Sequence, residues 1–438
     1  MSFNPQRLKK AFYAFSSVFK KQTAFDVPLA DEDLDSRHNC SVTFEDVVER
    51  ETIYDCGQED VFDEETTAQL KRVRLSYASI TPQRLFGWIC LFLSSTAGAT
   101  GTAQNEVQTI TSDATGGTFT ATFAFEGLTG TTGALAYNVT AANFKKALEA
   151  LASIGPGNIA SVTGTLATGF VVTFGGQLAK TNVPLLSIGA GSLTGNTGAP
   201  TVVQTTAGGN KYHAATRSSD DALAKTSMAC GWEGNSDNPK KYFNMVVESI
   251  TITLNRRKLV TVEVVCLARF TPEELTGFSE PDCENLPGLK GAECKIKVNS
   301  NYLIEEFWQA TIVLNNTVPT GDDAFPFSGI EVANFERGDK PTYPISMQIL
   351  GSGRDTVGTL IEDETKVPVE FLMGLPGNRA SLIFPNVLMK FASTPSVYVG
   401  EKNRSAHSIE ATPHKDATLH APLRAEAYLD QTEQFAAV

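Results

Sequence analysis

Alternation of apolar and polar residues predicts β-strands over much of this chain. Residues 73–77 alternate Val, Leu and Tyr with Arg and Ser, and a period of two places one set of side chains on a single face. The ranges 250–254 and 260–266 alternate in the same way on either side of the polar sequence 255–258. Two such runs joined by a short polar loop predict a hairpin.

The same pattern returns in the last third of the chain, at 308–315, 343–349 and 385–390. These runs loosely repeat the order of strands seen earlier. The repetition is one of pattern and not of identity, and it predicts an internal duplication of one β fold. We therefore expect a mainly β protein with two related lobes and short flanking helices.

Helices are expected at two internal places. Thr81 is a typical N-cap, Pro82 suits the first turn, and apolar residues then follow at helical spacing through Phe92. Thr140 is a second N-cap, ahead of a helix that we expect to run to about Ser153.

The first 25 residues also carry apolar side chains at steps of three and four. This spacing predicts an amphipathic helix, which packs on the body or on a neighbouring subunit, with the basic residues Lys9 and Lys10 on its other face. The N-terminus has no uninterrupted apolar stretch, and the longer apolar run at 85–93 is far shorter than a bilayer span. We expect neither a secretory signal nor membrane insertion. The apolar positions of the predicted helix are Leu8, Ala11, Phe12, Phe15, Val18 and Phe19.

Composition changes sharply near residues 97 and 211. Between them Gly, Thr and Ala dominate and charged residues are sparse, so a separate module is predicted inside another domain. The expected organisation is an N-terminal arm at 1–25, a discontinuous first lobe at 26–103 and 210–270, an inserted β module with one helix at 104–209, a linker at 271–300 and a second lobe at 301–438.

Charge is concentrated near the N-terminus. The whole chain has a formal net charge of −13, and the segment 26–65 alone holds fifteen acidic residues against two arginines. Such a segment is either a solvated arm or a face that docks on a basic neighbour. Tight nucleic-acid binding is not expected, because phosphate contacts require clustered Lys and Arg.

Candidate catalytic and metal-binding residues do not form a known pattern. The five histidines have no metal-ligand spacing, and no nucleophile or phosphate-loop motif is present. Asp31, Asp33 and Asp35 have the alternate spacing of a calcium loop, but Ser36 and Val42 stand where that loop needs Gly and Glu. The seven cysteines contain no CxxC pair, and free thiols are expected. We predict no enzyme activity, no cofactor and no metal.

Seven short blocks of the inserted module are similar to the immunoglobulin-like modules found on many phage structural proteins. This resemblance implies an immunoglobulin-like β domain carried on a virion protein. The blocks, in chain order, are 105–108 (NEVQ), 116–120 (GGTFT), 136–141 (AYNVTA), 147–151 (ALEAL), 154–158 (IGPGN), 171–174 (VVTF) and 182–186 (NVPLL).

The flanking regions resemble two-lobed phage tail tube proteins. The residues that carry this resemblance are 81–88 (TPQRLFGW), 240–252 (KKYFNMVVESITI) and 313–316 (VLNN). It implies duplicated β-sandwich or barrel lobes whose strands join those of neighbouring copies around a channel. The implied partners are copies of the chain in stacked rings, trimeric with pseudo-sixfold symmetry, together with other tail proteins and DNA that passes without specific binding. The implied location is the virion tail, after assembly in the host cytoplasm.

Contacts between stacked rings are expected to be electrostatic. The basic residues Lys9 and Lys10 and the basic hairpin tip would meet the acidic arm of the next ring. The residues assigned to this contact are Arg256, Arg257, Lys258, Lys9, Lys10, Asp31, Asp33 and Asp35. Two alternatives remain at this point: another phage structural protein, such as a distal tail, neck or capsid protein, and a carbohydrate-binding surface protein.

Overall fold

The predicted mainly β fold is confirmed in a computed structural model, where antiparallel strands dominate. The described part of the chain contains three α-helices. The structure describes residues 11–24, 27–54, 61–218, 223–232, 239–281, 287–303, 307–319, 335, 337, 341–350, 354–392, 397–399, 404–417 and 421–436.

One 18-stranded sheet forms the body, which is the chain outside residues 104–209. From the first half come β1 (Ala11–Phe15), β2 (Ser36–Arg37), β3 (Ser41–Tyr54), β4 (Val61–Tyr77), β13 (Lys211–Thr216), β14 (Lys225–Trp232), β15 (Lys240–Asn255), β16 (Thr261–Ala268) and β17 (Glu273–Glu274). From the second half come β18 (Cys294–Val298), β19 (Asn301–Tyr302), β20 (Phe307–Asn315), β21 (Ile345–Leu350), β22 (Val367–Leu375), β23 (Asn378–Phe391), β24 (Val397–Val399), β25 (Arg404–Pro413) and β26 (Arg424–Leu429).

The two halves are joined through this sheet. The predicted hairpin is present, with β15 antiparallel to β16, and the other edge of β15 pairs with β20 from Ser249 to Asn255. The largest hydrophobic cluster of the body holds buried residues of both halves. The segments assigned to separate lobes therefore share one sheet and one core.

The expected linker at 271–300 contains secondary structure in its last part. Its last part forms a short 3-10 turn, η3 (Gly291–Glu293), and then β18, which pairs with β22 from Cys294 to Val298. Apolar residues of β18 alternate with lysines and are buried. Pro and Gly earlier in the segment obscured this short strand in the sequence.

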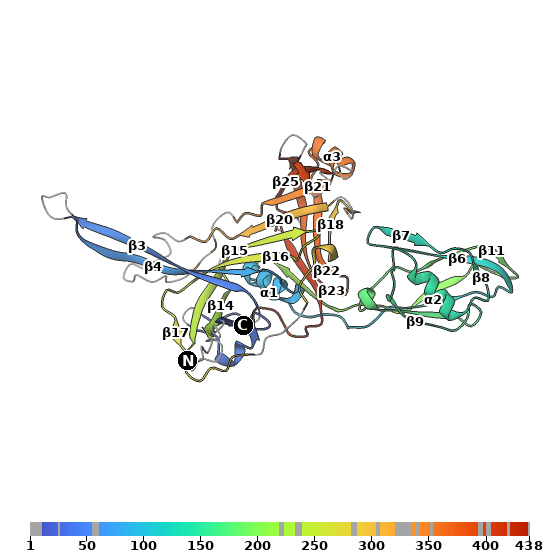
Figure 1. Cartoon of the computed structure of the whole chain (residues 1–438), viewed down its shortest axis with the longest axis horizontal. Helices are drawn as coiled ribbons and strands as arrows, with labels where there is room; N and C mark the ends of the chain where they lie inside the picture. Colours follow the sequence, from blue (N-terminus) through green and yellow to red (C-terminus); the bar gives the residue numbers. More distant parts are fainter. Residues whose placement is uncertain are drawn as a thin grey trace, which may run out of the picture.

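Helix α1 (Pro82–Leu93) lies at the centre of the body, packed on β15, β23 and β26 (Figure 1). Thr81 caps it as predicted, since its hydroxyl accepts the Arg84 backbone N–H at 3.3 Å. Its C-cap, Ser94, has the left-handed conformation common at helix ends. Most of its side chains are buried, including Trp88. A second body helix, α3 (Arg354–Glu362), packs on β23.

The predicted N-terminal helix is wrong over the described residues. Residues Ala11–Phe15 form strand β1, which pairs with β14 and β2, and no helix follows it before residue 24. The apolar side chains are nonetheless buried: Phe12, Phe15 and Phe19 are each at most 4% exposed. Their spacing fits a helix by chance, and available sheet edges on both sides stabilise a strand. Residues 1–10, with Lys9 and Lys10, lie outside the described residues.

The inserted module, called the insert from here on, has its own two sheets and its own core. One sheet has the order β12-β5-β10-β9 and the other has β6 between β11 and β7, with β8 also on β6. Thr140 caps α2 (Ala141–Glu149), which is shorter than expected. Phe119, Phe144 and Phe170 pack between the layers. The bounds are β5 (Val107–Thr111), β6 (Gly116–Phe125), β7 (Leu128–Thr131), β8 (Leu135–Ala136), β9 (Ile159–Thr163), β10 (Phe170–Phe174), η2 (Gly176–Leu178), β11 (Ser187–Thr194) and β12 (Thr201–Thr206).

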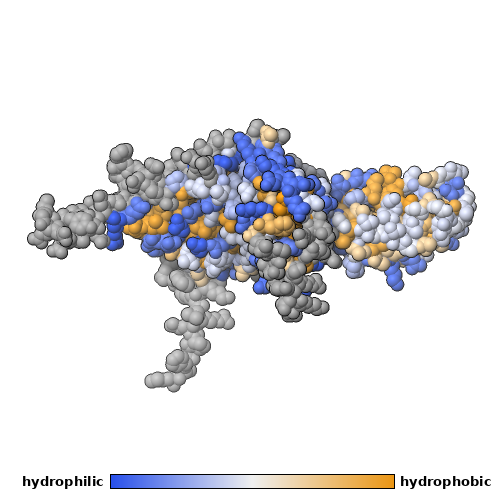
Figure 2. Space-filling model, turned by 90° about the horizontal axis from the view of Figure 1, so that it is seen from above, coloured by the Kyte–Doolittle hydropathy of each residue, from blue (hydrophilic) through white to orange (hydrophobic). Residues whose placement is uncertain are grey.

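The molecule is elongated, with different elements at its two ends. The hairpin of β3 and β4 projects from one end of the body, and the insert projects from the opposite end (Figure 1). The surface of the insert is mostly of intermediate hydropathy, whereas the body has strongly hydrophilic regions (Figure 2). This difference follows from the Gly, Thr and Ala content of the insert.

Candidate assembly surfaces

The β3–β4 hairpin carries the longest unsatisfied strand edge that we find among the described residues. β4 pairs on one side with β16 and on the other with β3. In the described part of the chain β3 pairs only with β4, over 14 residues. A long open edge presents backbone N–H and C=O groups that can bind another strand.

Side chains on β3 make this edge amphipathic. Val42 and Phe44 are partly buried and alternate with exposed polar residues near the base of the hairpin, and Val47 and Val48 further along are also partly buried. Apolar surface is visible where the hairpin leaves the body (Figure 2). Phe44 stacks on Tyr242 with ring centroids 4.7 Å apart, which anchors this base to β15.

Acidic residues of β3 are balanced by basic residues of β4 within the same hairpin. Lys71 Nζ lies 2.5 Å from Asp46 Oδ1, and Arg72 lies 3.8 Å from Glu45 and 3.2 Å from Glu248. These pairs are partly exposed, so each contributes little to stability. The acidic segment therefore has less uncompensated charge at its described base than its composition indicated.

The predicted acidic contact residues bind other groups of their own chain. Asp31 and Asp33 lie in η1 (Asp31–Asp33), where Asp31 pairs with Lys241 and Asp33 Oδ1 lies 2.6 Å from Lys20 Nζ. Asp35 accepts hydrogen bonds from the backbone N–H and the hydroxyl of Ser17, at 2.7 and 2.9 Å. These contacts tie the N-terminal segment to the body.

The predicted basic tip lies in the turn after β15. Arg257 and Lys258 are exposed and Arg256 is partly buried. The guanidinium of Arg257 lies 5.6 Å from the ring centroid of Trp308, and the Lys258 carbonyl accepts the Gly291 N–H at 2.7 Å. The turn is thus a supported, basic surface. These contacts place the basic turn beside β20 and η3. The acidic residues Asp31, Asp33 and Asp35 instead contact β15 and the N-terminal segment.

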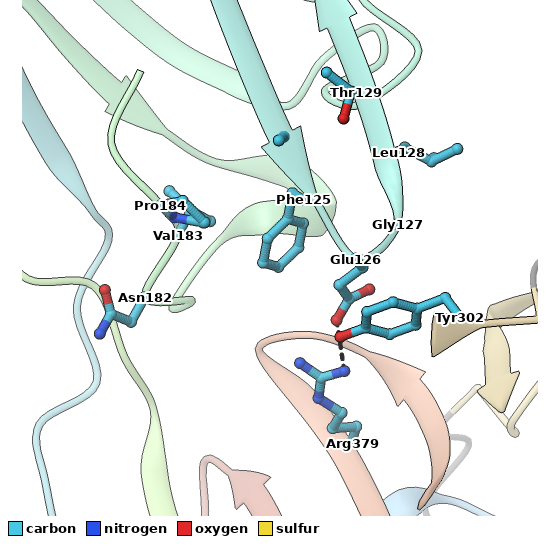
Figure 3. Close-up of a pocket in the computed structure, with 11 residues that line it drawn as sticks. Phe125, Glu126, Gly127, Leu128, Thr129, Asn182, Val183, Pro184, Tyr302 and Arg379 are labelled. Carbon is cyan, nitrogen blue, oxygen red and sulfur yellow. Dashed lines mark hydrogen bonds and ion pairs between the residues drawn. The ribbon is translucent and has the colours of Figure 1, made fainter. Parts of the chain in front are cut away.

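A cleft of about 620 Å³ separates part of the insert from the body (Figure 3). Phe125 at the end of β6 and Glu126 in the turn after it line the cleft from the insert, and Tyr302 and Arg379 line it from the body. Glu126 is 9% exposed and lies 2.6 Å from Lys295 Nζ and 2.7 Å from Arg379 Nη1. Burial alone raises the pKa of a carboxyl group, but Arg379 and Lys295 outweigh that effect and lower the pKa of Glu126 below its ordinary value.

No pattern in the sequence pointed to this group of residues. Glu126 is one of few charged residues of the insert, and it stands in the sequence Phe-Glu-Gly after a predicted strand. The signal that the sequence offered for this site was a single acidic residue in a module with few charged residues. Its partners lie more than 160 residues away, and only tertiary structure brings them together.

A second buried polar group lies beneath the N-terminal segment. The His38 ring is enclosed by Phe15, Phe19 and Trp88, and its Nδ1 lies 2.6 Å from the Tyr77 hydroxyl. Its Nε2 has no hydrogen-bond partner among the described residues. Burial, together with the charge of Arg84, lowers the pKa of His38 well below its ordinary value.

The described thiols are unpaired and shielded. Cys40, Cys90, Cys230, Cys266 and Cys294 are free in the described part of the chain. Burial raises the pKa of Cys40 and of Cys294 to about 12, so both remain protonated at neutral pH.

The described residues form neither a metal site nor a membrane-spanning helix. Within the described residues, no group of three or more His, Cys, Asp or Glu side chains is arranged to hold a metal ion. No described helix has the length and apolar character needed to cross a membrane.

No protein-family model matches this chain, and a search of curated proteins finds no match either.

Proposed function

We propose that this chain is a structural subunit that polymerises with copies of itself into the tail tube of a bacteriophage. The observation that carries the proposal is the open edge of β3 on a hairpin that projects beyond the body. The resemblance of the flanking sequence to tail tube proteins supports this kind of assembly.

An open edge of this length favours pairing with a further strand. Proteins that remain monomeric usually shorten, cover or charge such edges, because exposed backbone groups promote association. If one copy supplies the edge and the next supplies the pairing strand, the interface is heterologous, and it closes into a ring when the rotation permits. Stacked rings then form a tube.

The shape of the chain is compatible with this arrangement. Each half has a helix that follows a strand of the body sheet: α1 follows β4 and α3 follows β21. The hairpin β22–β23 comes directly after α3, whereas the insert, β13 and β14 separate α1 from the hairpin β15–β16. Two related halves per subunit suit trimeric rings with pseudo-sixfold symmetry. The insert leaves the body at the end opposite the hairpin (Figure 1), so we expect it on the outer wall, where it leaves the channel open for DNA.

Electron microscopy of the purified full chain tests the proposal directly. We expect tubes of uniform diameter and unlimited length, with a central channel. A distal tail, neck or capsid protein is expected to form closed rings or shells instead. A chain that stays a compact monomer at high concentration contradicts the proposal.

Hydrogen exchange of β3 tests the interface itself. Amides of residues 41–50 should exchange at least about tenfold more slowly in the assembly than in the monomer, because the open edge becomes hydrogen-bonded. Strand β15, which pairs on both sides within one chain, is the internal control and should not change. Tubes in which β3 exchanges as fast as in the monomer would place the contact elsewhere.

A further inference from the structure

Two connecting segments hold the insert on a narrow stalk. Isolated antiparallel bridges join Thr100 to Tyr212 and Gln104 to Gly209, so the entering and leaving segments pair with each other. A two-stranded stalk can bend, and motion between domains is the usual expectation when few contacts cross the boundary. The stalk alone does not set the direction in which the insert points.

The turn at the end of the β22–β23 hairpin lies against the backbone of the insert at Ala179. The Asn210 side chain donates a hydrogen bond to the Gly377 carbonyl at 2.7 Å. A Cβ at Gly377 would lie 2.0 Å from the Ala179 carbonyl oxygen, so this approach requires a residue without a side chain. The contact acts as a pivot beside the stalk.

Across the cleft from this region, Glu126 makes the second connection. Its backbone φ of 47° and the Gly127 φ of 82° form a tight left-handed turn between β6 and β7. That turn directs the carboxylate toward Arg379 on β23 (Figure 3). The carboxylate also accepts a hydrogen bond from Lys295 on β18. The side chain of Glu126 is only 5% exposed, and that of Arg379 is 13% exposed.

The joint is polar. The hydrophobic clusters of the insert and the body have no residue in common, and the cleft of about 620 Å³ lies between them. At the other side of the joint Lys180 Nζ lies 2.5 Å from Asp430 Oδ1, in a more exposed pair. Charged contacts therefore determine the orientation, and such contacts can open without exposing a hydrophobic core.

We propose that Glu126 is an ionic latch that holds the insert in one orientation on the body, and that loss of its charge frees the insert to swing about the stalk. Glu126 is a positioning residue in this proposal. Its two cationic partners come from separate strands of the second half, so one carboxylate fixes the insert in two directions. The proposal does not depend on the tail tube assignment.

The test compares Glu126→Gln with the native full chain. The amide keeps the size of the side chain but cannot pair with two cations. We expect amides of residues 124–129 and 376–382 to exchange at least about tenfold faster, and the insert to become blurred in electron-microscopy class averages. Both measurements apply to single subunits and to assemblies.

Two further variants control the result. Glu149→Gln removes one charge from the insert at its pair with Lys145, away from the joint, and should behave as the native chain does. Glu126→Arg combined with Arg379→Glu and Lys295→Glu reverses all three charges of the latch and should restore the native orientation and slow exchange. Rescue by charge reversal distinguishes a latch from a general packing defect.

The proposal is wrong if Glu126→Gln leaves exchange and class averages unchanged. It is also wrong if the variant unfolds the insert, seen as fast exchange of the core strands β6 and β10, because Glu126 then supports the fold of the module. Assembly into tubes by every variant would leave the tail tube proposal intact in either case, so the two ideas fail separately.

Discussion

At the scale of single residues, Gly87 is a position where ordinary helix propensity should mislead. Gly lies in the middle of α1, where Ala usually adds about 1 kcal/mol of stability. A Cβ at Gly87 would lie 2.1 Å from a ring carbon of Phe19, so the ring of Phe19 occupies the space that a side chain would need. The N-terminal segment is therefore locked onto α1 by the absence of a side chain.

Gly87→Ala should consequently destabilise the body. We expect a loss of about 1–3 kcal/mol in the free energy of unfolding, because the Phe19 ring must shift within a packed core. Chemical denaturation measures this loss. Gly133→Ala is the matched control, since a Cβ there meets no atom within 4 Å. An equal effect of both substitutions would show that the contact with Phe19 is unimportant.

His38 should make stability depend on pH. Its folded-state pKa is lowered, while in the unfolded chain it titrates near 6.5. The unfolded state therefore binds more protons below pH 6.5, and stability is full above that pH and falls as the pH decreases. We therefore expect stability to decrease between pH 6.5 and pH 5.

Denaturation at a series of pH values, for native protein and His38→Phe, measures this term. The decrease in stability at low pH should be much smaller in the variant than in the native protein. Part of it should persist because burial also lowers the pKa of His213. A decline of the same size in both proteins would assign the acid sensitivity to other groups.

At the scale of secondary-structure elements, the two capped helices offer a matched pair. Thr81 caps α1 in the body and Thr140 caps α2 in the insert, each by accepting a backbone N–H at 3.3 Å. The separate hydrophobic clusters of the two regions lead us to expect separate unfolding transitions.

Thr81→Ala and Thr140→Ala should each cost about 1 kcal/mol, but in different transitions. The first should lower the unfolding temperature of the body alone, and the second that of the insert alone. Calorimetry of the full chain measures both. If either substitution shifts both transitions, the insert and the body unfold as one unit.

The basic turn after β15 is the element for which a role in stacking is predicted. Reversal of Arg257 and Lys258 to Glu should block tube formation while the subunit stays folded, because both side chains are exposed. Arg256 is retained because it is partly buried. Reversal of Lys145 and Lys146 on the insert changes the charge equally and should permit tubes. Normal tubes from the first variant would remove this turn from the stacking contact.

At the scale of the whole molecule, the proposed role depends on the different elements at the two ends of the subunit. The projecting hairpin offers an open edge, and the insert stands at the opposite end behind a polar joint (Figure 1). Replacing residues 104–209 by a short Gly-Ser linker should leave tube formation intact and make the tubes narrower. Electron microscopy measures the diameter. Failure of the shortened but folded chain to assemble would give the insert a direct part in polymerisation.

Local sequence patterns were sufficient to predict the elements that depend on residues close together in the chain. Alternation at 250–254 and 260–266 predicted the β15–β16 hairpin, Thr81 and Pro82 predicted the start of α1, and composition separated the region that folds as two small sheets. Each depends on short-range preferences that act before the rest of the chain is placed.

Only the tertiary structure determined the strand pairings and ion pairs between residues that are far apart in the sequence. Strand β1 replaced a predicted helix because β14 and β2 offer edges on both sides. Both halves joined one sheet because β15 has a second edge for β20. Glu126 meets Lys295 and Arg379 only after the insert docks on the body. Hydrogen bonds between strands and ion pairs between distant residues leave no local periodicity, so the sequence by itself could not specify them.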